Sequence, residues 1–494
     1  MLCALAAFAG CGEDRPPLAP VAPVDSRMRY DGDGTPADGP VGRVTRPLIV
    51  LVCLDTVRAD ALAPWANGTP AMPETSEWLA GATTIFRDAH AAAPWTAPSV
   101  ASLLTGLLPS EHGLREFDDQ IKLVSAVPTV AEMLARAGAT CGAFTGGGWV
   151  RDSNGVLQGF ADAVAPFSFG AGAQTLVGNH RMLKARGAGS YFLFLHTYEA
   201  HDPYGAPPAR LGASPAPPTE GLAAAELAAI DAEAAADGGR SLVRRFLLDP
   251  ASRATVFETA AGGRRADVVR RWFEHVPEGD PKAAELLTEA RRGYEAGLRR
   301  LDHAVATYLK GADDAHVFDD AIVIFCSDHG EGFGEHGAMH HGRRLYEELT
   351  HVPLAIRAPG WPRGKVIDGP CSLLDVAPTI LDLCGLPAAK GHEGRSLASM
   401  VRGAERAPRL AVSEERRTPA ETGLPGDVTL VSVRDSKTTW IGTRDRRTGE
   451  LTAEAFDRES DPHEVHPLDP KAALPRASEA LRRRVEALVS DGVR

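Results

Sequence analysis

Short, continuous apolar runs alternate with amphipathic stretches along most of the chain. Runs rich in β-branched and aromatic residues, typical of strands buried on both faces, lie at 48–54, 191–195, 321–326 and 352–356. Between them, two segments place apolar residues at helical spacing and end on a glycine, at 129–138 and 283–311. Strands that alternate with helices predict an α/β fold with a largely parallel sheet covered by helices on both faces.

Two segments depart from this pattern. Residues 205–282 are rich in Ala, Gly and Pro and carry broken helical patterns, which predicts a helical insertion at the mouth of a substrate site in a catalytic domain spanning 46–406. After residue 406, the stretch 428–457 alternates apolar and polar residues around turn signals, and an amphipathic helix follows. We therefore expect a smaller α+β subdomain with antiparallel strands over 407–494.

The first residues are apolar and end in Ala-Gly-Cys, with Cys11 as the cysteine. Such a segment is typical of an export signal, and its ending resembles the lipobox of bacterial lipoproteins. Residues 12–45 are rich in Pro, Gly and Asp, which favours a disordered tether. The prediction is a signal over 1–11 and a protein held by a lipid anchor in the bacterial cell envelope, on the periplasmic side; a frayed terminus without a role is the alternative.

Composition narrows the range of partners. The 494 residues carry a net charge of −12 and no basic stripe, which argues against a nucleic-acid partner. No apolar run approaches the roughly 20 residues that a spanning helix needs. The seven cysteines give no even disulfide framework. Cys53 and Cys326 fit the core, and the spacing of Cys371 and Cys384 leaves a disulfide between them open.

Acidic residues and histidines follow the predicted strands. Asp55 follows the first run, Asp328 and His329 follow the run at 321–326, and His196 and His201 follow the run at 191–195. Because the carboxyl ends of parallel strands meet at one edge of a sheet, these side chains should converge. Carboxylates buried together repel one another unless a cation offsets their charge. The pattern therefore predicts a site for a hard divalent metal.

Thr96 opens the segment TAPSVASLLTG, which has the pattern of a helix start with Pro98 in the first turn. The simplest role for Thr96 is as the N-cap residue or the residue before it. A helix N-terminus also attracts anions through its free N–H groups and its dipole. A hydroxyl placed there beside a divalent cation can act as a nucleophile, so this second role stays open.

Five segments, in this order, resemble the signature segments of the sulfatases, which belong to the alkaline phosphatase superfamily: 52–60, 94–113, 196–204, 327–337 and 345–360. The resemblance covers roughly residues 46 to 470. It implies an alkaline-phosphatase/sulfatase-like fold, a sheet sandwiched by helices with a smaller C-terminal subdomain.

The resemblance also implies roles for individual residues. Asp55, Asp328 and His329 match the ligands of one divalent cation, Mn, Ca, Mg or Zn, with Thr96 at the nucleophile position and in the metal sphere. The histidines implied near the transferred group are His201 and His341, and the residues implied for substrate binding are His196, His340 and Arg58. A structural salt bridge is an equal alternative for Arg58. The spacing of the downstream histidines shows no clear second metal cluster, so a single cation is predicted.

The nucleophile position departs from the family pattern. Sulfatases carry Cys or Ser in a Cys-x-Pro-x-Arg motif and oxidise it to formylglycine, whereas this chain has Thr96 and, at the arginine position, Val100. Threonine there resembles the phosphodiesterases and the phosphoethanolamine and phosphoglycerol transferases of the superfamily. The predicted function is metal-dependent cleavage of phosphate mono- or diesters through a covalent Thr96 intermediate, with water or another alcohol as acceptor. A sulfuric ester hydrolase acting without formylglycine and an inactive, anion-binding envelope lipoprotein remain alternatives.

Overall fold

The computed structural model describes residues 48–491, except 117–120, 171, 174–175, 179, 181–188, 205–223, 250–261, 390, 406 and 419–426. The predicted signal and tether over 1–45 lie outside the described residues.

The centre of the molecule is an eight-stranded sheet with the strand order β4-β3-β5-β1-β6-β7-β2-β8. The strands from β4 to β6 in this order are parallel, and only β7 runs antiparallel to its neighbours β6 and β2. In chain order the strands are β1 Leu48–Leu54, β2 Thr84–His90, β3 Ala139–Phe144, β4 Asp162–Val164, β5 Ser190–Thr197, β6 Ile322–Ser327, β7 Leu354–Arg357 and β8 Lys365–Ser372. The sheet is therefore largely parallel, as the sequence predicts.

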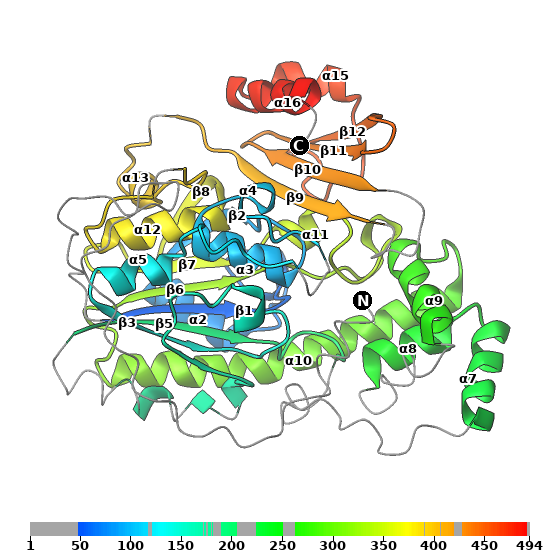
Figure 1. Ribbon diagram of the computed structural model, residues 1–494, viewed down its shortest axis with the longest axis horizontal. Helices are drawn as coiled ribbons and strands as arrows, with labels where there is room; N and C mark the ends of the chain where they lie inside the picture. The colour runs from blue at the N-terminus through cyan, green and yellow to red at the C-terminus, as the bar shows by residue number, and fades with distance from the viewer. Residues whose placement is uncertain are drawn as a thin grey trace.

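Both faces of this sheet are buried, as the continuous apolar runs require. Along β1, Val50 and Val52 point into one hydrophobic core, and Ile49 and Leu51 point into the core on the other face. The first core is closed by α2 Pro73–Ala82 and α10 Pro281–Asp314, and the second by α3 Thr96–Thr105, α5 Val130–Arg136 and α12 Val376–Leu383 (Figure 1).

The predicted insertion contains three described helices, α7 Ala224–Ala236, α8 Arg240–Leu248 and α9 Gly262–Glu274. They gather beyond one end of the long helix α10 (Figure 1). The remaining short helices are α4 Pro109–His112, α11 Glu347–Thr350 and α13 Ala398–Val401.

The C-terminal part forms a separate antiparallel sheet with the order β12-β11-β10-β9. Its elements are β9 Ala411–Arg417, β10 Val428–Arg434, β11 Thr438–Asp445, β12 Leu451–Asp457, α15 Pro470–Ala473 and α16 Glu479–Asp491. The two helices cover the outer side of this sheet (Figure 1). The antiparallel sheet and terminal helix expected from the alternating pattern are thus present.

Three local expectations need comment. Helix α10 does not stop at Gly311 but continues to Asp314, because Gly311 keeps a negative φ instead of the left-handed conformation that closes a helix. Cys371 and Cys384 are buried as free thiols, so the disulfide that their spacing left open is not formed. Among the described residues, no helix is both long enough and apolar enough to cross a bilayer.

Candidate functional site

Strand register brings the two aspartates together. Leu54 at the end of β1 pairs with Thr197 of β5 on one side and with Ser327 of β6 on the other. The residues that follow β1 and β6 are therefore Asp55 and Asp328, and the Asp55 N–H donates to the carbonyl of Thr197 at 3.1 Å. Both carboxylates are fully buried. The predicted convergence at the carboxyl edge of the sheet is observed.

Backbone groups fix Asp328 and His329 in place. Asp328 Oδ1 accepts hydrogen bonds from the N–H groups of His329 at 2.9 Å and Thr56 at 3.3 Å. His329 Nδ1 lies 2.9 Å from the carbonyl of Gly330, which assigns the ring proton to Nδ1 and leaves the Nε2 lone pair free. Thr56 adopts a left-handed backbone with φ of 58°, a strained conformation that turns the chain sharply after Asp55.

The donor set fits a divalent cation. Asp55 Oδ1 and Asp328 Oδ2 are buried and have no hydrogen-bond partner. One ligand atom each from Asp55, Asp328 and His329 can be chosen so that all three lie within 4.8 Å of one another. Buried carboxylate oxygens without a partner are costly unless a cation compensates them. Two carboxylates and an imidazole are suitable ligands for Mn, Mg, Ca or Zn.

Thr96 is the first residue of α3, and its hydroxyl faces this cluster. Thr96 Oγ1 donates to Asp55 Oδ2 at 3.0 Å and lies 3.3 Å from His329 Nε2. The N-cap residue is Trp95, and no side chain caps this helix. The interpretation of Thr96 as a capping residue is therefore wrong: its oxygen is used by Asp55 and His329 instead of the helix backbone. Pro98 lies in the first turn, as predicted.

His196 lies against the two carboxylates. Its Nε2 is 3.5 Å from Asp55 Oδ2 and 4.0 Å from Asp328 Oδ2, and the ring is fully buried. Burial disfavours the charged ring, but the two carboxylates outweigh this and raise the pKa of His196 to about 8. Burial likewise opposes ionisation of Asp55, and the neighbouring histidines nonetheless lower the pKa of its carboxyl. The structure thus places His196 beside the predicted metal ligands.

His201 and His341 form the next layer of the site. Their ring centroids are 4.9 Å apart, and the His341 ring is 4.6 Å from that of His329. His201 Nδ1 lies 2.7 Å from Asp202 Oδ1; despite burial, this carboxylate raises the pKa of His201 to about 10. Burial and the adjacent histidines lower the pKa of His341 well below its usual range. These surroundings favour the protonated form of His201 and the neutral form of His341.

Arg58 has a structural role in this arrangement. Its Nε donates to Asp60 at 3.0 Å, and its Nη1 donates to the carboxylate of Glu335 and to the carbonyl of Glu331, both at 2.8 Å. The ion pairs with Asp60 and Glu335 are those of the salt-bridge alternative, and substrate binding by Arg58 stays a prediction. Arg58 ties the turn after β1 to the loop that follows β6.

Several neighbours of the site were not singled out from the sequence. Tyr198 is two residues beyond His196, and its ring lies 4.9 Å from that of His196 and 5.4 Å from that of His201. The missing signal is its position directly after β5, which ends at Thr197, just as Asp55 and Asp328 directly follow β1 and β6. Glu331 and Asp202 were also missed; each lies within a segment that resembles the family, and each contacts a histidine of the site.

Comparison with known proteins identifies the family. The family model described as Sulfatase matches residues 47–386. The chain belongs to the sulfatase family of hydrolases. Sulfatase-family enzymes typically use a divalent metal, for which Asp55, Asp328 and His329 form a candidate cluster.

Curated sulfatases match over a limited stretch. The choline-sulfatase of Rhizobium meliloti strain 1021 is 31% identical over 200 residues, which cover 39% of this chain and 36% of the relative. Arylsulfatase K of Danio rerio is 32% identical over 143 residues, which cover 28% and 27%. The chain thus spans about a third of the length of these relatives.

Solved structures match over nearly the whole chain. The structure of BT4656 in complex with its substrate D-glucosamine-2-N,6-O-disulfate has a TM-score of 0.65 at 19% identity, covering 91% of this chain and 99% of that one. The phosphonate monoester hydrolase of Agrobacterium radiobacter has a TM-score of 0.61 at 21% identity, covering 90% and 95%. At such identities the likeness establishes a shared sulfatase-like fold.

Proposed function

We propose that this sulfatase-family protein cleaves phosphate mono- or diesters through a covalent intermediate on Thr96. The observation that carries the proposal is the position of the Thr96 hydroxyl at the start of α3, 3.0 Å from Asp55 Oδ2 and 3.3 Å from His329 Nε2. A threonine cannot yield the formylglycine aldehyde, so the hydroxyl itself has to serve as the nucleophile.

The step is an in-line displacement at phosphorus. Thr96 Oγ1 forms a bond to phosphorus and releases its proton toward Asp55 Oδ2, to which it is already hydrogen-bonded. The bond from phosphorus to the leaving oxygen breaks at the same time. Free N–H groups in the first turn of α3 and the helix dipole favour the anionic phosphoryl group. Water or an alcohol then attacks phosphorus and breaks its bond to Thr96.

His201 is the proposed acid for the leaving oxygen. Asp202 holds its ring and raises its pKa to about 10, so a proton is present on the ring at neutral pH. Burial and the neighbouring histidines lower the pKa of His341, which disfavours this ring as the acid. Of the two histidines expected near the transferred group, the electrostatics therefore favour His201 as the acid.

Asp55, Asp328 and His329 would hold the family's divalent cation. When bound, that cation supplies charge stabilisation for the oxygens of the ester and lowers the pKa of the Thr96 hydroxyl.

A sulfuric ester hydrolase that uses Thr96 directly is the second candidate. It is favoured by the names of the curated relatives, a choline-sulfatase and an arylsulfatase. Sulfate and phosphate esters are both tetrahedral anions, so the same helix N-terminus suits either.

Parallel assays separate the two candidates. The metal-loaded protein is tested with bis-p-nitrophenyl phosphate, p-nitrophenyl phosphate and p-nitrophenyl sulfate. We expect the higher kcat/KM on a phosphate ester, and loss of that turnover in Thr96→Ala but not in Thr105→Ala, which alters the far end of the same helix. Mass spectrometry after brief exposure to substrate should find one added phosphoryl group on the Thr96 peptide. Faster turnover of the sulfate ester, or full activity of Thr96→Ala, would overturn the proposal.

We also propose that the protein is exported to the bacterial envelope and lipidated at Cys11. The support is the apolar segment ending in Ala-Gly-Cys. Labelling of expressing cells with a radioactive fatty acid should mark the wild type and not Cys11→Ser.

A further inference from the structure

A second cluster of metal-ligating side chains lies in the loop after β6. The loop folds back on itself: Phe333 forms an antiparallel bridge with Met339, and the His340 N–H donates to the carbonyl of Gly332 at 2.9 Å. Gly334 has φ of 105° and sits at the turn, which requires a glycine. This fold brings Glu331 close to His340 and His341, although eight residues of chain separate Glu331 from His340.

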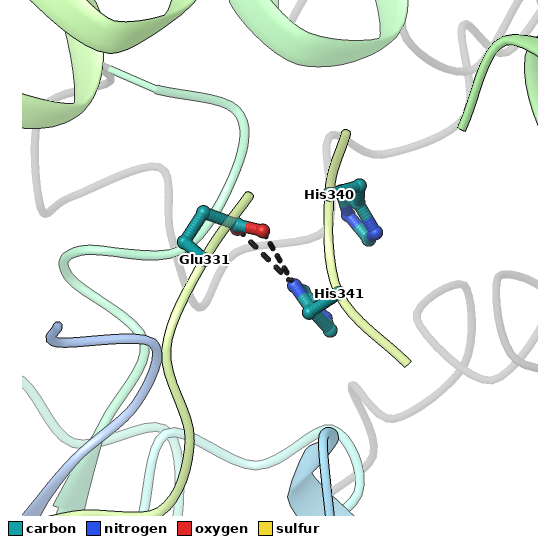
Figure 2. A group of neighbouring side chains, drawn as sticks. All are labelled: Glu331, His340 and His341. Atoms are coloured by element: carbon teal, nitrogen blue, oxygen red, sulfur yellow. Dashed lines mark hydrogen bonds and ion pairs between the residues drawn. The ribbon is translucent and has the colours of Figure 1, made fainter. Parts of the chain in front are cut away.

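Glu331 faces His341, and His340 lies beside His341 (Figure 2). His341 Nδ1 lies 3.2 Å and 3.1 Å from the two oxygens of Glu331, and the rings of His340 and His341 stack with centroids 4.0 Å apart. One ligand atom from each residue can be chosen so that all three lie within 4.8 Å of one another. Glu331 is fully buried and His341 is 6% exposed.

The buried carboxylates of the two clusters are paired with histidines instead of lysine or arginine. In the part of the chain that the structure describes, no lysine or arginine forms an ion pair with Asp55, Asp328 or Glu331; their partners are histidines. Among the residues that the structure describes, the buried Nδ1 of His340 finds no hydrogen-bond partner. His340 also adopts a left-handed backbone with φ of 68°, a strain that is common at functional sites.

We propose that Glu331, His340 and His341 bind a second divalent cation, of the zinc type. Two imidazoles and one carboxylate are a ligand set of catalytic zinc sites, in which the fourth position stays open for water or substrate. Nitrogen donors favour zinc and related transition metals over Mg and Ca. The sequence predicted a single cation because the spacing of 331, 340 and 341 gives no sign of the fold-back that joins them.

The position of this cluster gives the second cation a role at the same substrate. His341 packs against His329 of the first cluster, with 4.6 Å between ring centroids, and against His201 at 4.9 Å. Two cations side by side stabilise the attacking and the leaving oxygen of an in-line displacement. This role rests on the proposed function, whereas binding of the cation does not.

Metal stoichiometry in the absence of substrate tests the site. Untagged, metal-free protein is dialysed to equilibrium against a low concentration of Zn²⁺, and bound zinc is measured by elemental analysis. We expect two equivalents for the wild type and one for Glu331→Gln, His340→Gln, and Asp328→Asn. The control His303→Gln alters an exposed ion pair between α10 and Glu74 of α2, and should keep two. Combining Glu331→Gln with Asp328→Asn should leave none.

Other outcomes overturn the site. One equivalent in the wild type, or two in both Glu331→Gln and His340→Gln, would show that the cluster is a hydrogen-bonded network without metal. If Glu331→Gln does not fold, as judged by near-ultraviolet circular dichroism, His340→Gln gives the same answer, because its ring lies nearer the surface. Two equivalents of zinc with no turnover of any ester would contradict the proposed function but would still support the second metal site.

Discussion

The two clusters differ in how the chain builds them. The first takes Asp55, Thr96 and the pair Asp328–His329 from the ends of β1 and β6 and the start of α3. The second takes all its residues from one loop, 331–341, that folds back on itself. The first is thus positioned by the register of the central sheet, and the second by a few turns held by glycines. We expect the second cluster to be removable by a change that leaves the first in place.

Their donors differ as well. The first cluster offers mainly carboxylate oxygens, two of which are buried without a partner, and the second offers two imidazoles and one carboxylate. Oxygen-rich sites accept hard cations, and nitrogen-rich sites favour transition metals. The two clusters should therefore prefer different metals, although they are adjacent: the ring of His329 in the first packs against the ring of His341 in the second.

Removing a carboxylate from the first cluster should have the largest effect. In Asp55→Asn, the hydroxyl of Thr96 loses its negatively charged acceptor and the cation loses one negative ligand. We expect kcat/KM on a phosphate ester to fall by about 10³-fold or more, with zinc still bound by Glu331, His340 and His341. Steady-state kinetics measure the fall in kcat/KM, and elemental analysis measures the zinc that stays bound.

A matched control for this change is Asp368→Asn, which removes an exposed carboxylate paired with Arg87. That variant should retain wild-type kinetics, because surface ion pairs contribute little. Should Asp55→Asn keep more than about a tenth of the activity, the first cluster would not be the catalytic centre.

The fold and the first cluster were largely predictable from the sequence. The run at 48–54 corresponds to β1 residue by residue, because a strand buried on both faces leaves an unbroken apolar signal. Residues that follow such strands converge by topology, so Asp55 and Asp328 could be placed together without knowing any distance. The antiparallel course of β7 was not predictable, because a short apolar run carries no information on strand direction.

The second cluster and the role of Arg58 were not predictable for a different reason. Both depend on where the loop after β6 turns, which is set by contacts such as the bridge between Phe333 and Met339. Arg58 reaches Glu335 only because this loop passes beside the turn after β1. The periodicity of helices and strands does not predict contacts between loops, and the glycine-rich loop after β6 has no periodic pattern of its own.

An intermediate effect is expected when the fold-back of the loop is disturbed. A Cβ atom on Gly332 would lie 2.9 Å from the carbonyl oxygen of His340, so Gly332→Ala has to displace the backbone of His340. We expect zinc affinity at the second cluster to fall about tenfold, with metal binding at the first cluster retained. Isothermal titration with Zn²⁺ measures both sites.

Gly81→Ala on α2 is the control for Gly332→Ala, because a Cβ there meets no neighbour within 4 Å. Equal loss of metal at both clusters in Gly332→Ala would mean that the clusters are not positioned independently.

The smallest effect concerns the outer side of the same loop. His336 stacks on Tyr346, lies 3.1 Å from Glu348 and 2.8 Å from the carbonyl of Glu464, and so ties the loop to the C-terminal part. Despite partial burial, Glu348 raises the pKa of His336 to about 9. Because its pKa is raised, the charged ring stabilises the fold fully below the pKa of the unfolded state, near 6.5. This contribution is lost as the pH rises through about 9.

His336→Gln should therefore lower the free energy of unfolding by about 1 kcal/mol at pH 6 and by much less at pH 10. Urea unfolding at the two pH values measures how much this loss depends on pH. The pH-dependent part comes from the charge of the ring, because the strain of the left-handed backbone at His336 does not change with pH. An equal loss at both pH values would assign the effect to packing on Tyr346 alone.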